Sequence, residues 1–128
     1  MCIRDRSVAK IENVRGAALR SLEIFARAGV RMAFGTDLLG ESHRLQSDEF
    51  GLRAGVLGNA EALRAATVHA AHVLRRDSEL GVVAPGALAD LLLVDGNPLQ
   101  DITVLHGQGE RLALIVQGGK VVKDALAS

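Results

Sequence analysis

The fold is decided by the stretch Val30-Arg31-Met32-Ala33-Phe34-Gly35-Thr36-Asp37. Residues 30–34 are mostly apolar without strict alternation, which is typical of a short strand buried in a parallel sheet. The sequence therefore predicts a buried parallel strand over residues 30–34, closed by Gly35. Asp37 follows at once, at the carboxyl end where parallel sheets and barrels place their functional sites.

An amphipathic helix is expected before this strand, from about Val8 to Ala28. Its apolar residues recur at spacings of three and four, with charged residues off that stripe. Gly29 follows in the position where glycine most often ends a helix. Helix, glycine and buried strand in this order form the second half of a β-α-β repeat, so we expect an α/β fold.

A loop and two helices are expected after the strand. Leu38 to Gln46 is polar and irregular, which indicates a loop. Ser47 is expected to cap a helix that stops near Gly58. Asn59 is expected to cap a longer, alanine-rich helix that ends around Arg75-Arg76, because basic residues are favoured at a helix C-terminus.

The chain changes character after residue 80, where strands replace helices. Strands are expected over residues 89–94 and 112–116, and Gly118-Gly119 is a two-residue hairpin signal that leads into a third strand. We therefore expect helices and one buried strand over residues 8–80, and a small β unit over residues 81–128.

Composition and charge exclude several classes of function. The 128 residues are 48% apolar, which fits one globular domain. Fifteen basic and fifteen acidic residues cancel, and three Phe with no Trp or Tyr leave no platform for stacking bases. No stretch approaches the roughly 20 apolar residues of a membrane span. We expect a cytoplasmic protein that binds neither nucleic acid nor membrane.

The first seven residues, Met1 to Ser7, stand apart from the rest. They lack the apolar segment of a secretory signal and fit no helical or strand period. They resemble translated adaptor sequence, with a disordered native tail as the alternative. We expect residues 1–7 to be non-native, and this segment also contains Cys2, the only cysteine.

Asp37 is the strongest candidate for chemistry, although a turn or helix-capping aspartate explains its position equally well. His43 lies in the following loop, where contact with a substrate or metal and an ordinary exposed histidine are both open. His69 and His72 are spaced i, i+3 and can share a metal. Because no third ligand lies nearby in sequence, we expect these two histidines to be satisfied within their helix.

Four motifs in a fixed order resemble the amidohydrolase superfamily. They are the run ending in Gly35-Thr36-Asp37, the helix Glu61-Ala62-Leu63-Arg64-Ala65-Ala66-Thr67, the stretch from Leu80 to Val94, and a tail that includes Asp95-Gly96-Asn97-Pro98 and Val116 to Val122. Leu38 to Glu41, His43 and Gln46 to Phe50 are most similar to imidazolonepropionase-like members, the branch that includes Xaa-Pro dipeptidases. The resemblance covers nearly everything from residue 8 onward.

This resemblance implies the C-terminal fragment of a larger α/β enzyme. Residues 8–80 would be the last βα portion of a metal-dependent (β/α)8 TIM barrel, and residues 81–128 part of a small β-sandwich. The implied reaction is hydrolysis of C–N bonds in a small-molecule substrate by a metal-activated water. Asp37 would bind a divalent metal, usually zinc, and accept the proton of the water, and His43 would contact the substrate. The resemblance leaves open whether the parent enzyme is a homo-oligomer.

One departure from the superfamily limits what this chain can do alone. The other expected ligands are a His-x-His pair, a mid-barrel lysine or glutamate and two further histidines, and none has a counterpart here. A catalytic zinc needs about three protein ligands. We therefore expect the isolated chain to be inactive. The alternative is a small non-catalytic α/β interaction module, which would need a closed core.

Overall fold

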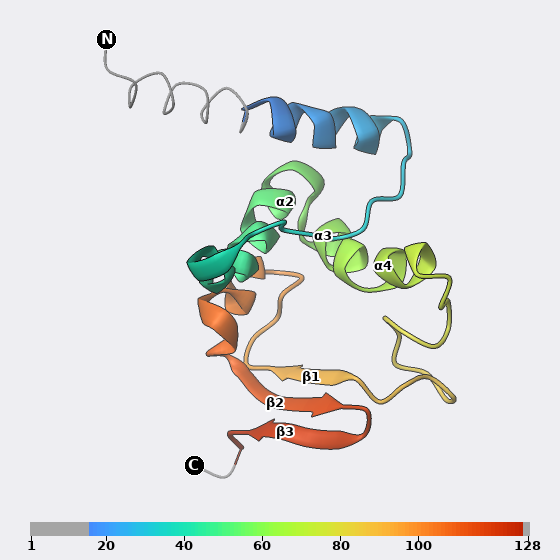
Figure 1. Cartoon of the computed structure of the whole chain (residues 1–128), viewed down its shortest axis with the longest axis vertical. Helices are drawn as coiled ribbons and strands as arrows, with labels where there is room; N and C mark the ends of the chain where they lie inside the picture. Colours follow the sequence, from blue (N-terminus) through green and yellow to red (C-terminus); the bar gives the residue numbers. More distant parts are fainter. Residues whose placement is uncertain (1–15, 127–128) are drawn as a thin grey trace. The chain divides into compact units, whose positions relative to one another are not determined.

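The computed structural model describes residues 16–126, so residues 1–7 and their predicted non-native origin lie outside it. The chain divides into two compact units, residues 1–31 and residues 32–128. The elements of the second unit are η1 (Gly40–Asp48), α2 (Glu49–Leu57), α3 (Asn59–Ala66), α4 (Val68–Val73), β1 (Leu91–Val94), η2 (Ile102–Leu105), η3 (Gly107–Gly109), β2 (Leu112–Gln117) and β3 (Lys120–Asp124), where η marks a 3-10 helix (Figure 1).

The first unit contains a helix over residues 16–27. Gly29, with φ of 70°, donates from its backbone N–H to the carbonyl of Ala26, and the N–H of Val30 donates to Phe25. This pair of bonds is the Schellman ending that a left-handed glycine permits. The predicted helix and its glycine stop are confirmed over residues 16–27, and the expected residues 8–15 lie outside the described chain.

The predicted strand over residues 30–34 is wrong for this chain, because residues 30–39 form neither helix nor strand. The segment is nevertheless held in place, since Phe34 donates its N–H to the carbonyl of Ala65 at 2.9 Å. A parallel strand needs a neighbouring strand to receive its backbone hydrogen bonds. Within residues 16–126 the three strands pair only with one another.

The segment after Asp37 differs from the expected loop. Residues 40–48 form the 3-10 helix η1, and α2 follows it directly. Ser47 does not cap α2, because its hydroxyl accepts a hydrogen bond from the backbone N–H of Gln108 at 3.4 Å. The predicted end of this helix near Gly58 is confirmed, and Gly58 has φ of 83°.

The long helix expected from Asn59 is broken at Thr67 into α3 and α4. Thr67 has φ of −122° and ψ of −95°, and its hydroxyl donates to the carbonyl of Leu63 at 2.7 Å. Gly81 lies against this break, where an added Cβ would be 2.5 Å from the carbonyl carbon of Thr67. Asn59 does not cap the helix; it is the first helical residue, and its side chain donates to the carbonyl of Leu99.

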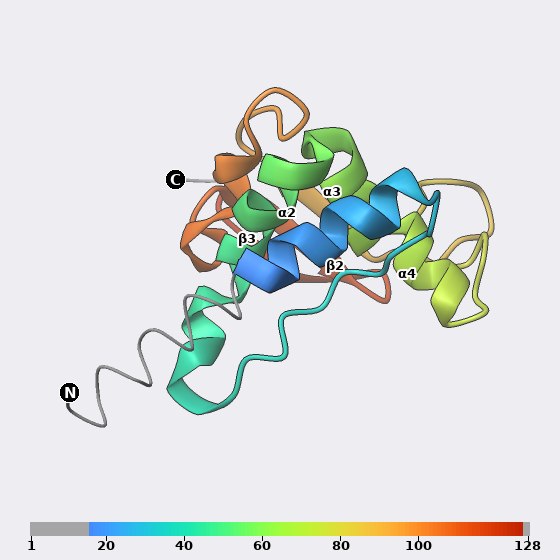
Figure 2. The same ribbon diagram turned by 90° about the horizontal axis from the view of Figure 1, so that it is seen from above.

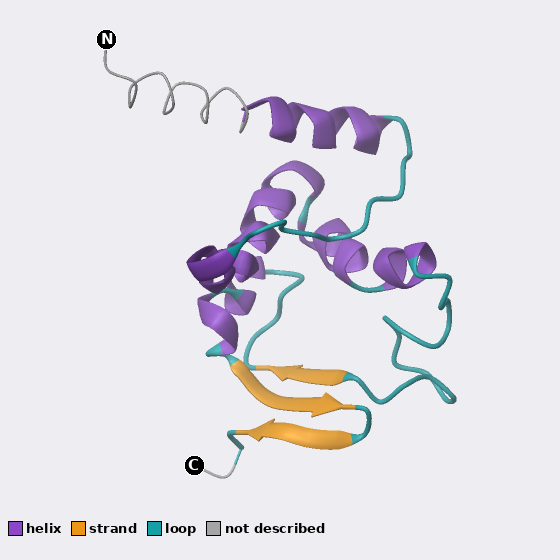
Figure 3. Cartoon of the chain, in the orientation of Figure 1, coloured by secondary structure: helices purple, strands orange, loops and turns teal. Residues whose placement is uncertain are grey.

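The β unit is confirmed as a three-stranded antiparallel sheet in the order β1-β2-β3 (Figure 3). Gly118 and Gly119 have φ of 54° and 78°, as the two central residues of a type I′ hairpin turn require. Asp90 accepts a hydrogen bond from the N–H of Gly118 at 2.6 Å, which fastens the entry of β1 to the hairpin turn.

Helices α2, α3 and α4 form a layer that lies over the sheet (Figure 2). The link between β1 and β2 includes η2, which Asp101 caps by accepting hydrogen bonds from the N–H and hydroxyl of Thr103. These bonds lower the pKa of Asp101.

The buried apolar residues are few and mostly small: Ala62, Ala65, Ala71, Ile102 and Val104. None of the described helices is long and apolar enough to cross a membrane.

Candidate functional site

Asp37 lies at the end of the extended segment, immediately before the residues that lead into η1, and it is exposed. Its φ of 51° is in the left-handed region, which few residues other than glycine adopt and which aspartate tolerates better than most. Backbone outliers of this kind cluster at functional sites. The carboxylate makes no hydrogen bond or ion pair with any residue from 16 to 126.

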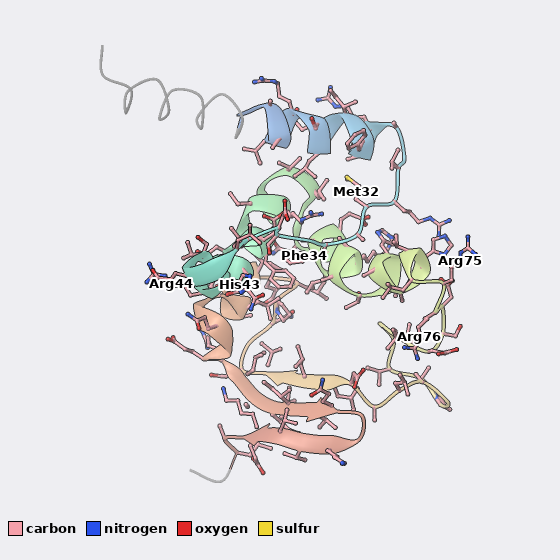
Figure 4. The ribbon with its side chains drawn as sticks, viewed as in Figure 1. Met32, Phe34, His43, Arg44, Arg75 and Arg76 are labelled. Carbon is pink, nitrogen blue, oxygen red and sulfur yellow. The ribbon has the colours of Figure 1, made fainter. Side chains whose placement is uncertain are left out.

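His43 lies in η1 and is exposed (Figure 4). Its ring, like the carboxylate of Asp37, contacts no polar or charged partner among the described residues. The structure thus leaves both predicted site residues on the surface of the second unit, available to groups outside this chain.

Arg53 holds the segment that carries Asp37. This arginine is buried in α2, and its Nε lies 2.7 Å from Oε1 of Glu49. Its two terminal nitrogens donate to the carbonyls of Ala33 at 3.1 Å and Gly35 at 3.4 Å. Sequence reasoning missed Arg53, and the available signal was a Glu49–Arg53 spacing of four on an expected helix.

Aromatic contacts complete this attachment. The guanidinium carbon of Arg53 lies 5.2 Å from the ring centroid of Phe34, within the range of a cation–π contact. The rings of Phe34 and Phe50 have centroids 4.4 Å apart and are tilted by 34°. The segment before Asp37 is therefore fixed to α2 by hydrogen bonds, charge and packing together.

An open, mostly apolar cavity of about 780 Å³ lies beside this segment, between the helical layer and the sheet. Its lining includes Phe34, Gly35, Thr36, Phe50, Leu63, Leu92, Val94 and Leu112. Neither Asp37 nor His43 is among its lining residues, and none of the lining residues in the described part of the chain is acidic or basic.

The remaining histidines do not assemble a metal centre. His72 places Nδ1 3.0 Å from Oδ1 of Asp77, whereas Nδ1 of His69 is 3.4 Å from Oε1 of Glu61 without the geometry of a hydrogen bond. The two rings thus face different carboxylates and share no ligand. Among the described residues, no group of three or more His, Cys, Asp or Glu side chains could hold a metal ion.

His106 received no role from the sequence and is half-buried in the structure. Its ring packs on α2 so closely that a Cβ at Gly51 would lie 3.0 Å from Cε1. Its Nε2 is shielded from solvent and has no hydrogen-bond partner among the described residues. This contact joins the link between β1 and β2 to the helical layer.

The Amidohydrolase family profile matches residues 2–122, and the chain belongs to this family. The predicted resemblance to the superfamily is confirmed.

Solved structures give the finer relationships. The crystal structure of an amidohydrolase is 52% identical in sequence to this chain and superposes on it with a TM-score of 0.89. The match covers 94% of this chain and 29% of the amidohydrolase. A prolidase crystallised with N-methylphosphonate-L-proline is 53% identical to this chain, with a TM-score of 0.87. The match covers 92% of this chain and 29% of the prolidase. The imidazolonepropionase of Geobacillus thermodenitrificans is 36% identical over 63 residues, 49% of this chain and 15% of that enzyme.

These matches confirm the predicted branch of imidazolonepropionase-like and Xaa-Pro dipeptidase-related members. They also show how little of each relative is represented. The chain spans 24% of the length of the first curated relatives it matches, and 29% of the two solved enzymes described above. It corresponds to part of a larger amidohydrolase.

Proposed function

We propose that this chain is the C-terminal fragment of a metal-dependent hydrolase that cleaves amide, cyclic amide or peptide-like C–N bonds in small molecules. The observation that carries the proposal is the 53% identity to a prolidase over 92% of the chain. Membership of the amidohydrolase family supports the same reaction class. The similarity to a prolidase and to an imidazolonepropionase supports the proposed substrate class.

The arrangement proposed for the parent enzyme keeps the expected boundaries. Residues 8–80 are the last βα portion of a (β/α)8 barrel, and residues 81–128 are part of a small β-sandwich. Residues 30–34 pair with no strand among the described residues. This supports the assignment, because the last strand of a barrel would pair with strands from other parts of the barrel.

Asp37 is proposed as one ligand of a divalent metal, with zinc expected, and as the acceptor of a proton from the attacking water. Its exposed carboxylate, free of partners in the described chain, supports this role. A metal supplies a water that ionises near neutral pH, and a neighbouring carboxylate can accept its proton. His43, exposed in η1, is proposed to contact the substrate.

The residues of this chain do not by themselves fit a catalytic metal. Asp37 offers one carboxylate, and no described group of three ligands exists. About three protein ligands are needed. The remaining ligands would belong to the part of the parent enzyme that precedes this chain, so the isolated chain is proposed to be inactive.

A chimaera tests the role of Asp37. In the solved prolidase, the 29% of the chain that matches would be replaced by the matching residues of this chain. Asp37→Asn in the active chimaera should lower kcat/KM about 100-fold or more, the range for loss of a general base. The control is Asp48→Asn, which alters an exposed acid without a side-chain hydrogen bond at the start of α2. Equal activity of the two variants would remove Asp37 from the mechanism.

A further inference from the structure

The backbone of residues 33–35 is held by residues of two helices, Arg53 on α2 and Ala65 on α3. The carbonyls of Ala33 and Gly35 accept from the guanidinium of Arg53, at 3.1 and 3.4 Å. The N–H of Phe34 donates to the carbonyl of Ala65 at 2.9 Å.

The position of Arg53 is itself fixed. Its side chain is 9% exposed, and the carboxylate of Glu49, four residues earlier on α2, balances its charge at 2.7 Å. A buried guanidinium without such a partner would be strongly destabilising. The planar fork of arginine can hold two acceptors at once, whereas a lysine ammonium is a point charge. The spacing of the two carbonyls therefore calls for arginine in particular.

The held carbonyl of Gly35 lies two residues before Asp37. Asp37 has a left-handed φ of 51°, and the direction of its carboxylate depends on where the preceding residues are fixed. We infer that Arg53 is the positioning residue of Asp37, holding residues 33–35 so that the carboxylate is aimed before any ligand arrives. This inference rests on the proposed role of Asp37. The Arg53 side chain contacts Glu49, Phe34 and the carbonyls of residues 33 and 35, so its effect on Asp37 would be indirect.

The first test uses the 128-residue chain and needs no activity. Amide hydrogen exchange of Phe34 would be measured in the wild type, in Arg53→Lys, and in Arg64→Lys as a matched control. Arg64 is exposed on α3, and its side chain makes no hydrogen bond or ion pair with the described residues. We expect Arg53→Lys to raise exchange at Phe34 at least about tenfold while the amides within α3 stay unchanged. Equal rates in both variants would overturn the inference.

The second test separates positioning from stability in the active prolidase chimaera. Arg53→Lys should lower kcat on the order of 10- to 100-fold, the effect of a small misplacement of a catalytic group, with KM changed less than about twofold. Arg53→Gln should lower kcat further, and Arg64→Lys should match the wild type. A kcat for Arg53→Lys equal to that of Arg64→Lys would overturn the inference, as would a loss of activity that only follows the fraction of unfolded protein.

The two proposals fail in different ways. If Asp37→Asn abolishes activity and Arg53→Lys does not change kcat, the role of Asp37 stands and the positioning role of Arg53 falls. If Asp37→Asn retains activity, the proposed function of Asp37 falls and the inference falls with it, whatever the exchange rates show.

Discussion

Gly81 is a residue for which both backbone conformation and space demand glycine. Its φ is 71°, and a Cβ would lie 2.5 Å from the carbonyl carbon and 2.6 Å from the carbonyl oxygen of Thr67. Because these are backbone atoms, a rotamer change cannot relieve the clash. We predict that Gly81→Ala lowers the free energy of unfolding by about 2 kcal/mol or more, measured by urea denaturation followed by circular dichroism.

Gly86→Ala is the matched control for this substitution. Gly86 also has a positive φ, of 86°, but no atom lies within 4 Å of an added Cβ. Only the conformational cost, about 1 kcal/mol, should remain. If the two substitutions destabilise the chain equally, the contact between Gly81 and the break in the helix contributes nothing to stability.

At the scale of single residues, the sequence predicted where a candidate residue lies along the chain better than it predicted which distant groups that residue contacts. Asp37 could be selected because it follows an apolar run and a Gly-Thr pair, both local features. Arg53 could not be selected, because its role depends on the carbonyls of Ala33 and Gly35, 20 and 18 residues away. Ser47 and Asn59 were wrongly expected to be caps, since each finds a distant partner, Gln108 and Leu99 respectively.

At the scale of the elements, the turn of the β2–β3 hairpin offers a position where a substitution should stabilise the chain. Gly118 has φ of 54°, and an added Cβ there would meet nothing within 4 Å. Asn-Gly is the preferred pair for a type I′ turn, and asparagine restricts the unfolded chain more than glycine does. We predict that Gly118→Asn stabilises the chain by up to about 1 kcal/mol, measured by urea denaturation.

The control for the hairpin is Gly118→Ala, which adds a Cβ without the tolerance of asparagine for left-handed backbone. It should destabilise the chain by about 1 kcal/mol. If alanine is tolerated as well as asparagine, the turn does not limit the stability of the sheet.

Elements with local causes were predicted correctly, and elements that depend on distant segments were not. The sheet hairpin and the helix ending at Gly29 depend on glycines within a few residues of the chain. The strand over residues 30–34 depends on neighbours that the described residues do not contain. The break at Thr67 depends on Gly81, 14 positions further on, so the helical periodicity across it gave no warning.

At the scale of the whole molecule, the second unit leaves much apolar surface exposed to solvent. Leu92 and Leu93 on β1 are 57% and 49% exposed, and Val121 and Val122 on β3 are 59% and 57% exposed. β1 and β3 are also the edge strands of the sheet, whose unpaired backbone groups attract other strands. Exposed apolar faces and open strand edges are surfaces that other protein segments can cover. They fit the proposed fragment, whose parent enzyme would supply those segments.

The described residues also bring together too few ligands for a catalytic metal. Asp37 is one carboxylate, and His69 and His72 face separate acids, so no arrangement among residues 16–126 provides the ligands of a catalytic site. We predict that zinc titrated into the purified chain, followed by isothermal calorimetry, gives only weak binding that Asp37→Asn leaves unchanged. Assays with Xaa-Pro dipeptides should show no turnover. Tight binding of one zinc per chain, or turnover lost on chelation, would mean that the fragment holds a complete site.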